Sequence, residues 1–295
     1  MKFKLFYFIV LFGFLSSHGQ YTEVINSNKP GFSESPYSVG LGIYQFESML
    51  FYQKKSIEPT FSIPESLGFD LVFRTNFLSE KLELNVQIAH QKDQVSFKNI
   101  FTSSYYSSGI SKATLGAKYL LFQPEFTDKT KEIRSFRKRN AFDAKRLIPS
   151  VAIYTGLNTN LVSKIHQTER ITPKAGVLLQ NDLSDRLNII TNVFYDKIGS
   201  DFEEISYVIT ATYNFSNRWS TFFENQSFYN NNKSGTNFAT GLVYLFNRNL
   251  QVNTSARFVQ EKEALGFYGG FGISYRMDKH KESLKYSQEK RTKMR

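Results

Sequence analysis

The stretch NDLSDRLNIITNVFYD, residues 181–196, begins with a polar segment and continues as a strictly alternating series. From Leu187 onward, one parity reads Leu, Ile, Thr, Val, Tyr, and the other reads Asn, Ile, Asn, Phe, Asp. Successive side chains of a β-strand point to opposite faces, so this pattern predicts a strand that leaves a tight turn. Related patterns recur as NFLSEKLELNVQIAH from Asn76, YNFSNRWSTFFENQSF from Tyr213 and YLFNRNLQVNTSARFV from Tyr244. The repetition indicates an all-β protein built from antiparallel hairpins.

The same alternation extends over nearly all of the chain after Gly40. It predicts about twelve strands, each long enough for the 9–11 tilted residues that cross a hydrocarbon layer. The even number agrees with bacterial single-chain transmembrane barrels. The predicted strands lie near 41–53, 68–78, 81–90, 109–123, 147–157, 170–182, 186–196, 204–215, 218–229, 236–246, 249–260 and 265–277.

The connections between these strands fall into two groups. Four are very short and rich in Ser, Asn and Asp, which close turns through their own side chains: 78–81, 183–186, 216–218 and 247–249. The others are mostly longer and polar, such as KKSIEPTFSIPES (54–66) and QKDQVSFKNIFTSSYYSS (91–108). Short periplasmic turns that alternate with longer extracellular loops are typical of outer-membrane barrels.

The last predicted strand shows the two faces clearly. Leu265, Phe267, Phe271, Ile273, Tyr275 and Met277 share one parity, and the opposite parity carries glycines, Tyr268, Ser274 and Arg276. A closed antiparallel transmembrane β-barrel over residues 40–277 would turn the apolar face to lipid and leave no unpaired edge. Interfacial girdles are expected from the aromatic residues at strand ends, namely Tyr44, Tyr52, Phe77, Phe215, Trp219, Tyr229, Phe246 and Tyr275.

Two other architectures share parts of this pattern. A soluble β-sandwich or jelly roll also alternates, but it buries the apolar face against a second sheet. A solenoid or propeller would also explain why the last three short turns recur every 31–33 residues. The abundance of aromatic residues, 29 Phe and 17 Tyr, favours the barrel.

The N-terminus, MKFKLFYFIVLFGFLSSHGQ, predicts export. Lys2 and Lys4 precede an apolar run from Leu5 to Leu15, which is too short for a membrane-spanning helix and fits a secretory signal peptide over residues 1–19. An uncleaved anchor helix is the alternative. Residues 20–39 are rich in Ser, Asn and Pro and are predicted to form a periplasmic or plug-like segment within an outer-membrane protein.

The chain has no cysteine and a net charge of +11. The absence of cysteine excludes disulfides, thiol catalysis and cysteine-based zinc sites. The positive charge is concentrated in the signal peptide, in a long periplasmic turn over residues 124–146 and in a tail over residues 278–295, so no basic face remains for nucleic acid. The turn and tail either dock on anionic lipid or an acidic periplasmic partner, or are simply solvated.

Three stretches resemble one known family. INSNKPGFSESPYSV (25–39) with QFESMLFY (45–52), SKATLGAKYLLF (111–122) and FGISYRMDKHKE (271–282) are similar to the barrel family labelled "putative meta-pathway of phenol degradation", whose Bacteroidota members are called transporter-family proteins. The resemblance implies an outer-membrane barrel that passes small, often hydrophobic compounds. The chain departs from the family pattern at Asn28-Lys29-Pro30, in place of Asp-Arg-Pro, and at Ser111-Lys112, in place of an acidic residue.

If the apolar parity faces lipid, the opposite parity lines the lumen. The polar residues on it carry both signs of charge, unlike the single-sign rings that select ions. We therefore expect a hydrogen-bonded, partly salt-bridged interior that narrows or plugs the pore, whose charges either satisfy one another or guide a solute. The predicted lumen residues are Gln45, Glu47, Asp70, Arg74, Glu83, Lys112, Lys118, Lys174, Asp196, Glu224, Arg257 and Arg276.

These features predict a passive channel or transporter without cofactor or metal. Its expected partners are outer-membrane lipid, a small-molecule solute and, through the last strand, the barrel-assembly machinery. The alternative is a structural or adaptor barrel that recruits periplasmic partners through its basic turn and tail. An enzyme is not expected, because His90 on the lipid-facing parity has Ile88 and Lys92 beside it rather than a serine, and the scattered His166 and His280 form no metal cluster.

Overall fold

The computed structural model describes residues 24–56, 61–98, 102–126, 143–166, 170–231, 234–261 and 264–279. The predicted signal peptide, most of the predicted basic turn and nearly all of the predicted basic tail lie outside the described residues. In the part that is described, no helix has the length and apolar character needed to cross a membrane.

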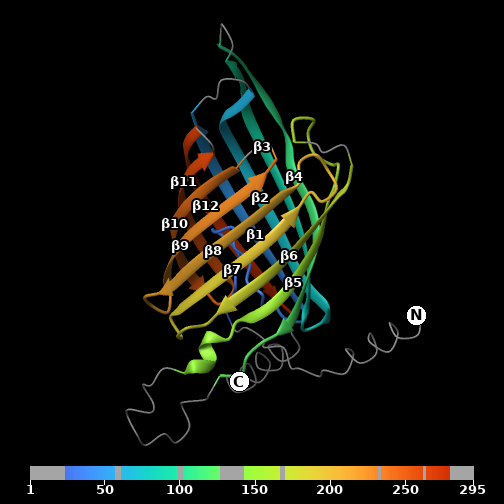
Figure 1. Ribbon diagram of the computed structural model, residues 1–295. Coiled ribbons are helices and arrows are strands. Elements are labelled where there is room, and N and C mark those ends of the chain that lie inside the picture. Colours follow the sequence, from blue (N-terminus) through green and yellow to red (C-terminus); the bar gives the residue numbers. More distant parts are fainter. Residues whose placement is uncertain are drawn as a thin grey trace, which may run out of the picture.

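Twelve antiparallel strands form one closed barrel, as the sequence predicted (Figure 1). Each strand pairs with its neighbours in the chain, and the ring closes where β1 pairs with β12, from Ile43 opposite Asp278 to Lys55 opposite Gly266. The strands are β1 (Ile43–Lys55), β2 (Phe61–Ser79), β3 (Leu82–Lys98), β4 (Thr102–Phe122), β5 (Ser150–Asn158), β6 (Thr172–Asn181), β7 (Leu187–Asp196), β8 (Glu204–Asn214), β9 (Trp219–Asn230), β10 (Ser234–Asn247), β11 (Leu250–Glu261) and β12 (Ala264–Asp278).

The apolar parity lies on the outside of this barrel. On β12 the side chains of Phe271 and Ile273 are 49% and 44% exposed, whereas those of Ser274 and Arg276 are buried. A sandwich would bury the first pair, so that alternative is wrong. The exterior is the apolar surface of an outer-membrane barrel, and the interior is predominantly polar.

The predicted girdle aromatics are exposed on the exterior. Trp219 packs against Tyr244, and Tyr244 packs against Phe246, at the end of the barrel that carries the short turns. Tyr52 and Tyr229 are exposed toward the opposite end. The side chain of Phe77, also predicted for the girdle, lies outside the described residues.

The short turns close as their composition predicted. The Ser184 hydroxyl accepts hydrogen bonds from the backbone N–H groups of Arg186 and Leu187, and the Ser216 hydroxyl does the same for Arg218 and Trp219. These bonds satisfy donors that a tight turn would otherwise leave unpaired. Because short turns face the periplasm in bacterial barrels, this end is the periplasmic end.

The two long polar loops predicted at 54–66 and 91–108 are largely strand. β2 already begins at Phe61, and β3 and β4 continue to Lys98 and from Thr102, so their hairpin stands above the rest of the barrel (Figure 1). Pro64 lies where the β2–β3 register shifts and beyond the last β1–β2 pair. A proline is tolerated at such an irregularity because no ladder hydrogen bond is lost.

The start of the fifth strand also differs from the prediction. Residues from Leu147 were expected in a strand, but Ala144–Leu147 form the short 3₁₀ helix η1 and β5 begins at Ser150. The Asp143 carboxylate caps η1 by accepting a hydrogen bond from the Lys145 N–H. A local capping residue therefore overrides the alternating pattern here.

Candidate functional site

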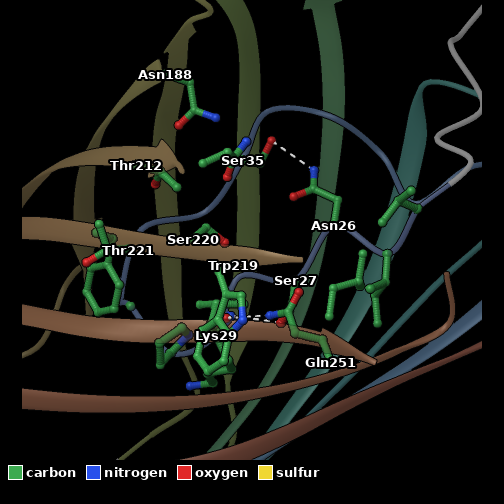
Figure 2. A pocket seen from close by; sticks show the side chains of 18 of the residues that line it. Asn26, Ser27, Lys29, Ser35, Asn188, Thr212, Trp219, Ser220, Thr221 and Gln251 are labelled. Atoms are coloured by element: carbon green, nitrogen blue, oxygen red, sulfur yellow. Dashed lines mark hydrogen bonds between the residues drawn. The ribbon is translucent and has the colours of Figure 1, made fainter. Parts of the chain in front are cut away.

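Residues 24–39, called the N-terminal segment below, lie inside the barrel. The segment is held by side chains from well-separated strands: Glu47 on β1, Asn192 on β7, Glu224 on β9 and Ser274 on β12. Because these partners surround the lumen, the segment crosses it, as the trace between the strands in Figure 2 also shows.

The Glu224 carboxylate holds the middle of the segment. It accepts hydrogen bonds from the backbone N–H groups of Phe32 (2.9 Å) and Ser33 (3.2 Å), and it is itself buried. A Cβ atom placed on Gly31 would lie 2.6 Å from Glu224 Oε2, so any other residue at this position would displace the carboxylate. Arg257 faces the same carboxylate at 3.4 Å and stacks on the Phe32 ring.

A second anchor is a buried charge cluster near the periplasmic end. Arg74 donates to both carboxylate oxygens of Glu83 at 2.8 and 3.0 Å and to Glu47 Oε1 at 2.8 Å. Lys118 Nζ lies 3.0 Å from Glu83 Oε1. Glu47 Oε2 in turn accepts the backbone N–H of Asn28 at 3.0 Å. The wall charges thus satisfy one another and bind the N-terminal segment at the same time.

Lys29 forms the third anchor. Its ammonium lies 2.6 Å from Asp70 Oδ2, and both side chains are largely buried. The Gln87 amide donates to both oxygens of the same carboxylate. A buried ammonium would be costly without this ion pair, so Lys29 fixes the height of the segment within the lumen.

Two cavities lie against the N-terminal segment. The periplasmic cavity, about 400 Å³ in volume, lies between the segment and β7–β11, and neutral polar side chains dominate its lining (Figure 2). The extracellular cavity, about 210 Å³, lies on the other side and contains Lys112, Lys174, Tyr154, Phe194 and Asp196. Side chains labelled in Figure 2 that line the periplasmic cavity include Asn188, Thr212, Trp219, Ser220, Thr221 and Gln251.

The same four residues of the segment line both cavities: Asn28, Lys29, Gly31 and Ser33. The segment is therefore the partition between the cavities. Among the described residues, hydrogen bonds and the Lys29–Asp70 ion pair hold it against the barrel wall.

A sequence model of the family described as "Putative MetA-pathway of phenol degradation" matches residues 27–277. The chain belongs to this family. The match begins inside the N-terminal segment and ends in β12, so the segment is part of the domain that defines the family, together with the barrel.

Solved structures share the fold at low sequence identity. An outer membrane channel from Pseudomonas putida F1 is 11% identical with a TM-score of 0.58, over 86% of this chain and 100% of that one. The NanC porin is 8% identical with a TM-score of 0.50, over 78% of this chain and 100% of the porin. At such identities the likeness shows the barrel fold alone. Among curated proteins, no sequence matches this chain.

The twelve predicted lumen residues all occupy the interior parity, and the structure sorts them into groups. Nine are buried, and Lys112, Lys174 and Asp196 are half-buried. The groups are Gln45, Glu47, Arg74, Glu83 and Lys118 in the periplasmic cluster; Asp70 with Lys29; Glu224 with Arg257; Lys112, Lys174 and Asp196 at the extracellular cavity; and Arg276 beside Asn249 and Asp278 at the periplasmic end.

Several residues of the site were not predicted. On the wall these are Asn192, which exchanges two hydrogen bonds with Glu34, and the Tyr154–Phe194 ring pair. A signal was available, because Asn192 and Phe194 share the parity of Asp196 in the alternating stretch 187–196. The anchoring residues of the N-terminal segment carried no such signal, since they lie outside any alternating pattern.

The two histidines that the structure describes, His90 and His166, lie away from this site, and His280 lies outside the described residues. His90 is exposed on the exterior, and His166 Nε2 lies 2.7 Å from Asp93 Oδ2 above the barrel, where Ser66 and Gln91 also donate to Asp93. The Asp93–His166 contact fastens the connection after β5 against the β3–β4 hairpin. Within the described ranges, no three His, Cys, Asp or Glu residues come together in a way that could hold a metal ion.

Proposed function

We propose that this protein is an outer-membrane channel for the passive passage of small molecules, hydrophobic and aromatic ones among them, and that its N-terminal segment closes the lumen. The observation that carries the proposal is the partition itself. Two cavities lie within one closed barrel, and the residues of the N-terminal segment that line both of them are Asn28, Lys29, Gly31 and Ser33.

The structure supports passive passage through general features. A barrel of twelve strands is wider than one that side chains alone can fill, and a polar interior admits water and solute. The structurally similar protein from Pseudomonas putida F1 is an outer membrane channel, which supports this function. In the proposed cycle, the segment moves aside and the two cavities join.

A reversible crosslink tests both parts of the proposal. The hydroxyls of Ser27 on the segment and Ser274 on β12 lie 2.8 Å apart, and the natural chain has no cysteine. The double variant Ser27→Cys, Ser274→Cys should form a disulfide that fixes the segment. We expect liposomes with the oxidised variant to be as tight as protein-free liposomes, and reduction to restore the permeability of the wild type.

A matched control uses two wall residues instead. Ser227 on β9 and Thr236 on β10 also have hydroxyls 3.0 Å apart, so Ser227→Cys, Thr236→Cys joins strand to strand without touching the segment. This variant should stay permeable when oxidised. Wild-type liposomes no more permeable than protein-free ones would refute the channel, and equal permeability of the oxidised and reduced Ser27–Ser274 variant would refute closure by the segment.

The adaptor alternative depends on the basic turn and the basic tail, most of which lie outside the described residues. It therefore stays a prediction, as does recognition by the barrel-assembly machinery through β12. No feature of the described residues favours it over the channel. A role other than catalysis is also proposed, because the buried carboxylates Glu47, Asp70 and Glu224 are engaged in holding the segment.

A further inference from the structure

The periplasmic cavity is lined by neutral hydrogen-bonding side chains that the protein itself leaves free. Those of Asn188, Thr212, Asn214 and Ser220 line it and have no hydrogen-bond partner among the described residues. The Oδ1 atom of Asn188 is also buried. Amides and hydroxyls each offer both a donor and an acceptor, so a solute in this cavity meets free groups of both kinds.

These four side chains are neighbours on the barrel wall. Asn188 on β7 stands opposite Thr212 on β8, and Asn214 on β8 stands opposite Ser220 on β9. Directly opposed residues of an antiparallel pair have Cβ atoms about 4.5–5.5 Å apart. Together they form one polar patch, called the wall patch below, of which Figure 2 labels Asn188, Thr212 and Ser220.

An apolar surface adjoins the wall patch. Phe222 on β9 stands opposite Thr212, and its ring lies over Gly241 on β10, where an added Cβ would come within 2.6 Å of Phe222 Cε1. Val243 and Leu245 continue this surface along β10. A ligand that matches the wall should therefore carry hydroxyl groups and an adjoining C–H face.

The other side of the cavity is polar as well. Asn26 on the N-terminal segment and Gln251 on β11 line it, and neither side-chain oxygen has a partner among the described residues. The Gln251 amide makes only a long contact, 3.4 Å, with the Lys29 carbonyl oxygen. A solute with a single hydroxyl can bind to one side at a time, whereas one with several hydroxyls can bind to both.

The charged members of the lining are either paired or at the mouth. Lys29 is paired with Asp70 at 2.6 Å, and Asp185 with Arg146 at 2.6 Å. Arg186 and Arg218 lie in exposed periplasmic turns, where solvent and salt screen their charge. The wall patch is thus neutral, and an uncharged solute matches it without a counter-ion.

We propose that the periplasmic cavity binds an uncharged, polyhydroxylated single-ring solute, such as a monosaccharide or a cyclitol, with its hydroxyls on the wall patch and its C–H face along Phe222. This inference rests on the proposed channel and names a class of solute for it. The volume of about 400 Å³ corresponds to about thirteen water molecules at about 30 Å³ each. One such ring fits together with some water, and a long oligosaccharide does not.

Equilibrium binding to the folded full-length protein tests this class, in a detergent without a sugar head group. Isothermal titration with glucose, myo-inositol, cyclohexanol, glucuronate and glucosamine separates the effects of hydroxyl number and charge. We expect glucose or myo-inositol to bind at least about tenfold more tightly than cyclohexanol, which has one hydroxyl. Glucuronate and glucosamine should bind more weakly than glucose, because the wall patch offers their charge no partner.

Two substitutions locate the site. Asn188→Leu and Thr212→Val should each weaken binding about two- to tenfold, and the double variant at least about tenfold, because each removes hydrogen-bonding groups at similar volume. The matched control is Thr254→Val on the exposed exterior face of β11, which should leave binding unchanged. Urea unfolding of each variant shows whether the fold is retained.

Three results would overturn the inference. They are no binding of either glucose or myo-inositol, affinities unchanged in the double variant, and binding of cyclohexanol, glucuronate or glucosamine as tight as that of the better of glucose and myo-inositol. These titrations do not depend on permeability. A sealed barrel that binds glucose would therefore refute the channel alone, and a permeable barrel that binds neither polyol would refute this inference alone.

Discussion

Arg74→Met removes the centre of the buried periplasmic cluster, and we expect it to destabilise the barrel strongly. Arg74 is completely buried, and three of its hydrogen bonds end on carboxylate oxygens of Glu47 and Glu83 at 2.8–3.0 Å. A fourth ends on the carbonyl oxygen of Asn26 in the N-terminal segment. Methionine fills much of the volume but leaves two buried carboxylates with fewer positive partners.

The magnitude follows from these contacts. Removing one partner of a buried ion pair costs about 3–5 kcal/mol, because the other charge remains desolvated. Lys118, 3.0 Å from Glu83, still compensates one of the two carboxylates, which argues against a larger loss. We therefore expect a loss of about 3–5 kcal/mol in the free energy of unfolding. Adding Glu47→Gln should recover part of it, so the two changes should not be additive.

Reversible urea unfolding in lipid vesicles measures this loss. The single tryptophan, Trp219, lies on the exterior and reports insertion through its fluorescence. Arg186→Met in an exposed turn is the control and should change stability by no more than about 0.5 kcal/mol. A loss below about 1 kcal/mol for Arg74→Met would show that the cluster is hydrated or replaceable, contrary to this reasoning.

Three smaller changes test other contacts. Gly31→Ala brings a Cβ to 2.6 Å from Glu224 Oε2, so amide hydrogen exchange in the N-terminal segment should accelerate, and unchanged exchange would contradict the close approach. Ser216→Ala removes a hydroxyl that accepts two turn N–H groups and should cost about 0.5–1.5 kcal/mol in urea unfolding. The hydrogen bond from the Tyr195 hydroxyl holds the pKa of the exposed Glu203 carboxyl below its usual range. Ordering of this loop should thus be complete above about pH 4.3 and decline as the pH falls through that lower pKa; an NMR titration showing no such change would refute it.

The barrel could be predicted because the features that produce it, alternating side chains and turn residues, are local and periodic in the sequence. Alternation on Leu265–Met277 decides which face meets lipid, and Ser184 and Ser216 mark the turns that their own hydroxyls close. The strand ends were harder to predict. The β3–β4 hairpin continues through a polar stretch because cross-strand pairing between Val95 and Tyr105 extends it beyond the apolar belt, and pairing partners cannot be identified from one strand alone.

For the site, the face of each residue could be predicted, but its contacts could not. Parity alone placed Glu47, Arg74 and Glu224 on the interior face. It could not show that Glu47 and Glu224 accept backbone N–H groups of residues 28–33, or that Arg74 donates to the Asn26 carbonyl oxygen, because those contacts join positions as far apart in the chain as Phe32 and Glu224. Only closure of the barrel brings such partners together.

The charges of the lumen differ in how closely they are paired at its two ends. Near the periplasmic end, the charges of Arg74, Glu83 and Lys118 are used up within the wall and in holding the segment, so substitutions there should change stability and closure more than solute preference. At the extracellular cavity the ion pair between Lys174 and Asp196 is longer, 3.8 Å, and both side chains are only half-buried, so substitutions there should cost less stability than those in the periplasmic cluster. Mutual satisfaction therefore describes the charges of the periplasmic cluster, and solute guidance stays a prediction for the charges of the extracellular cavity.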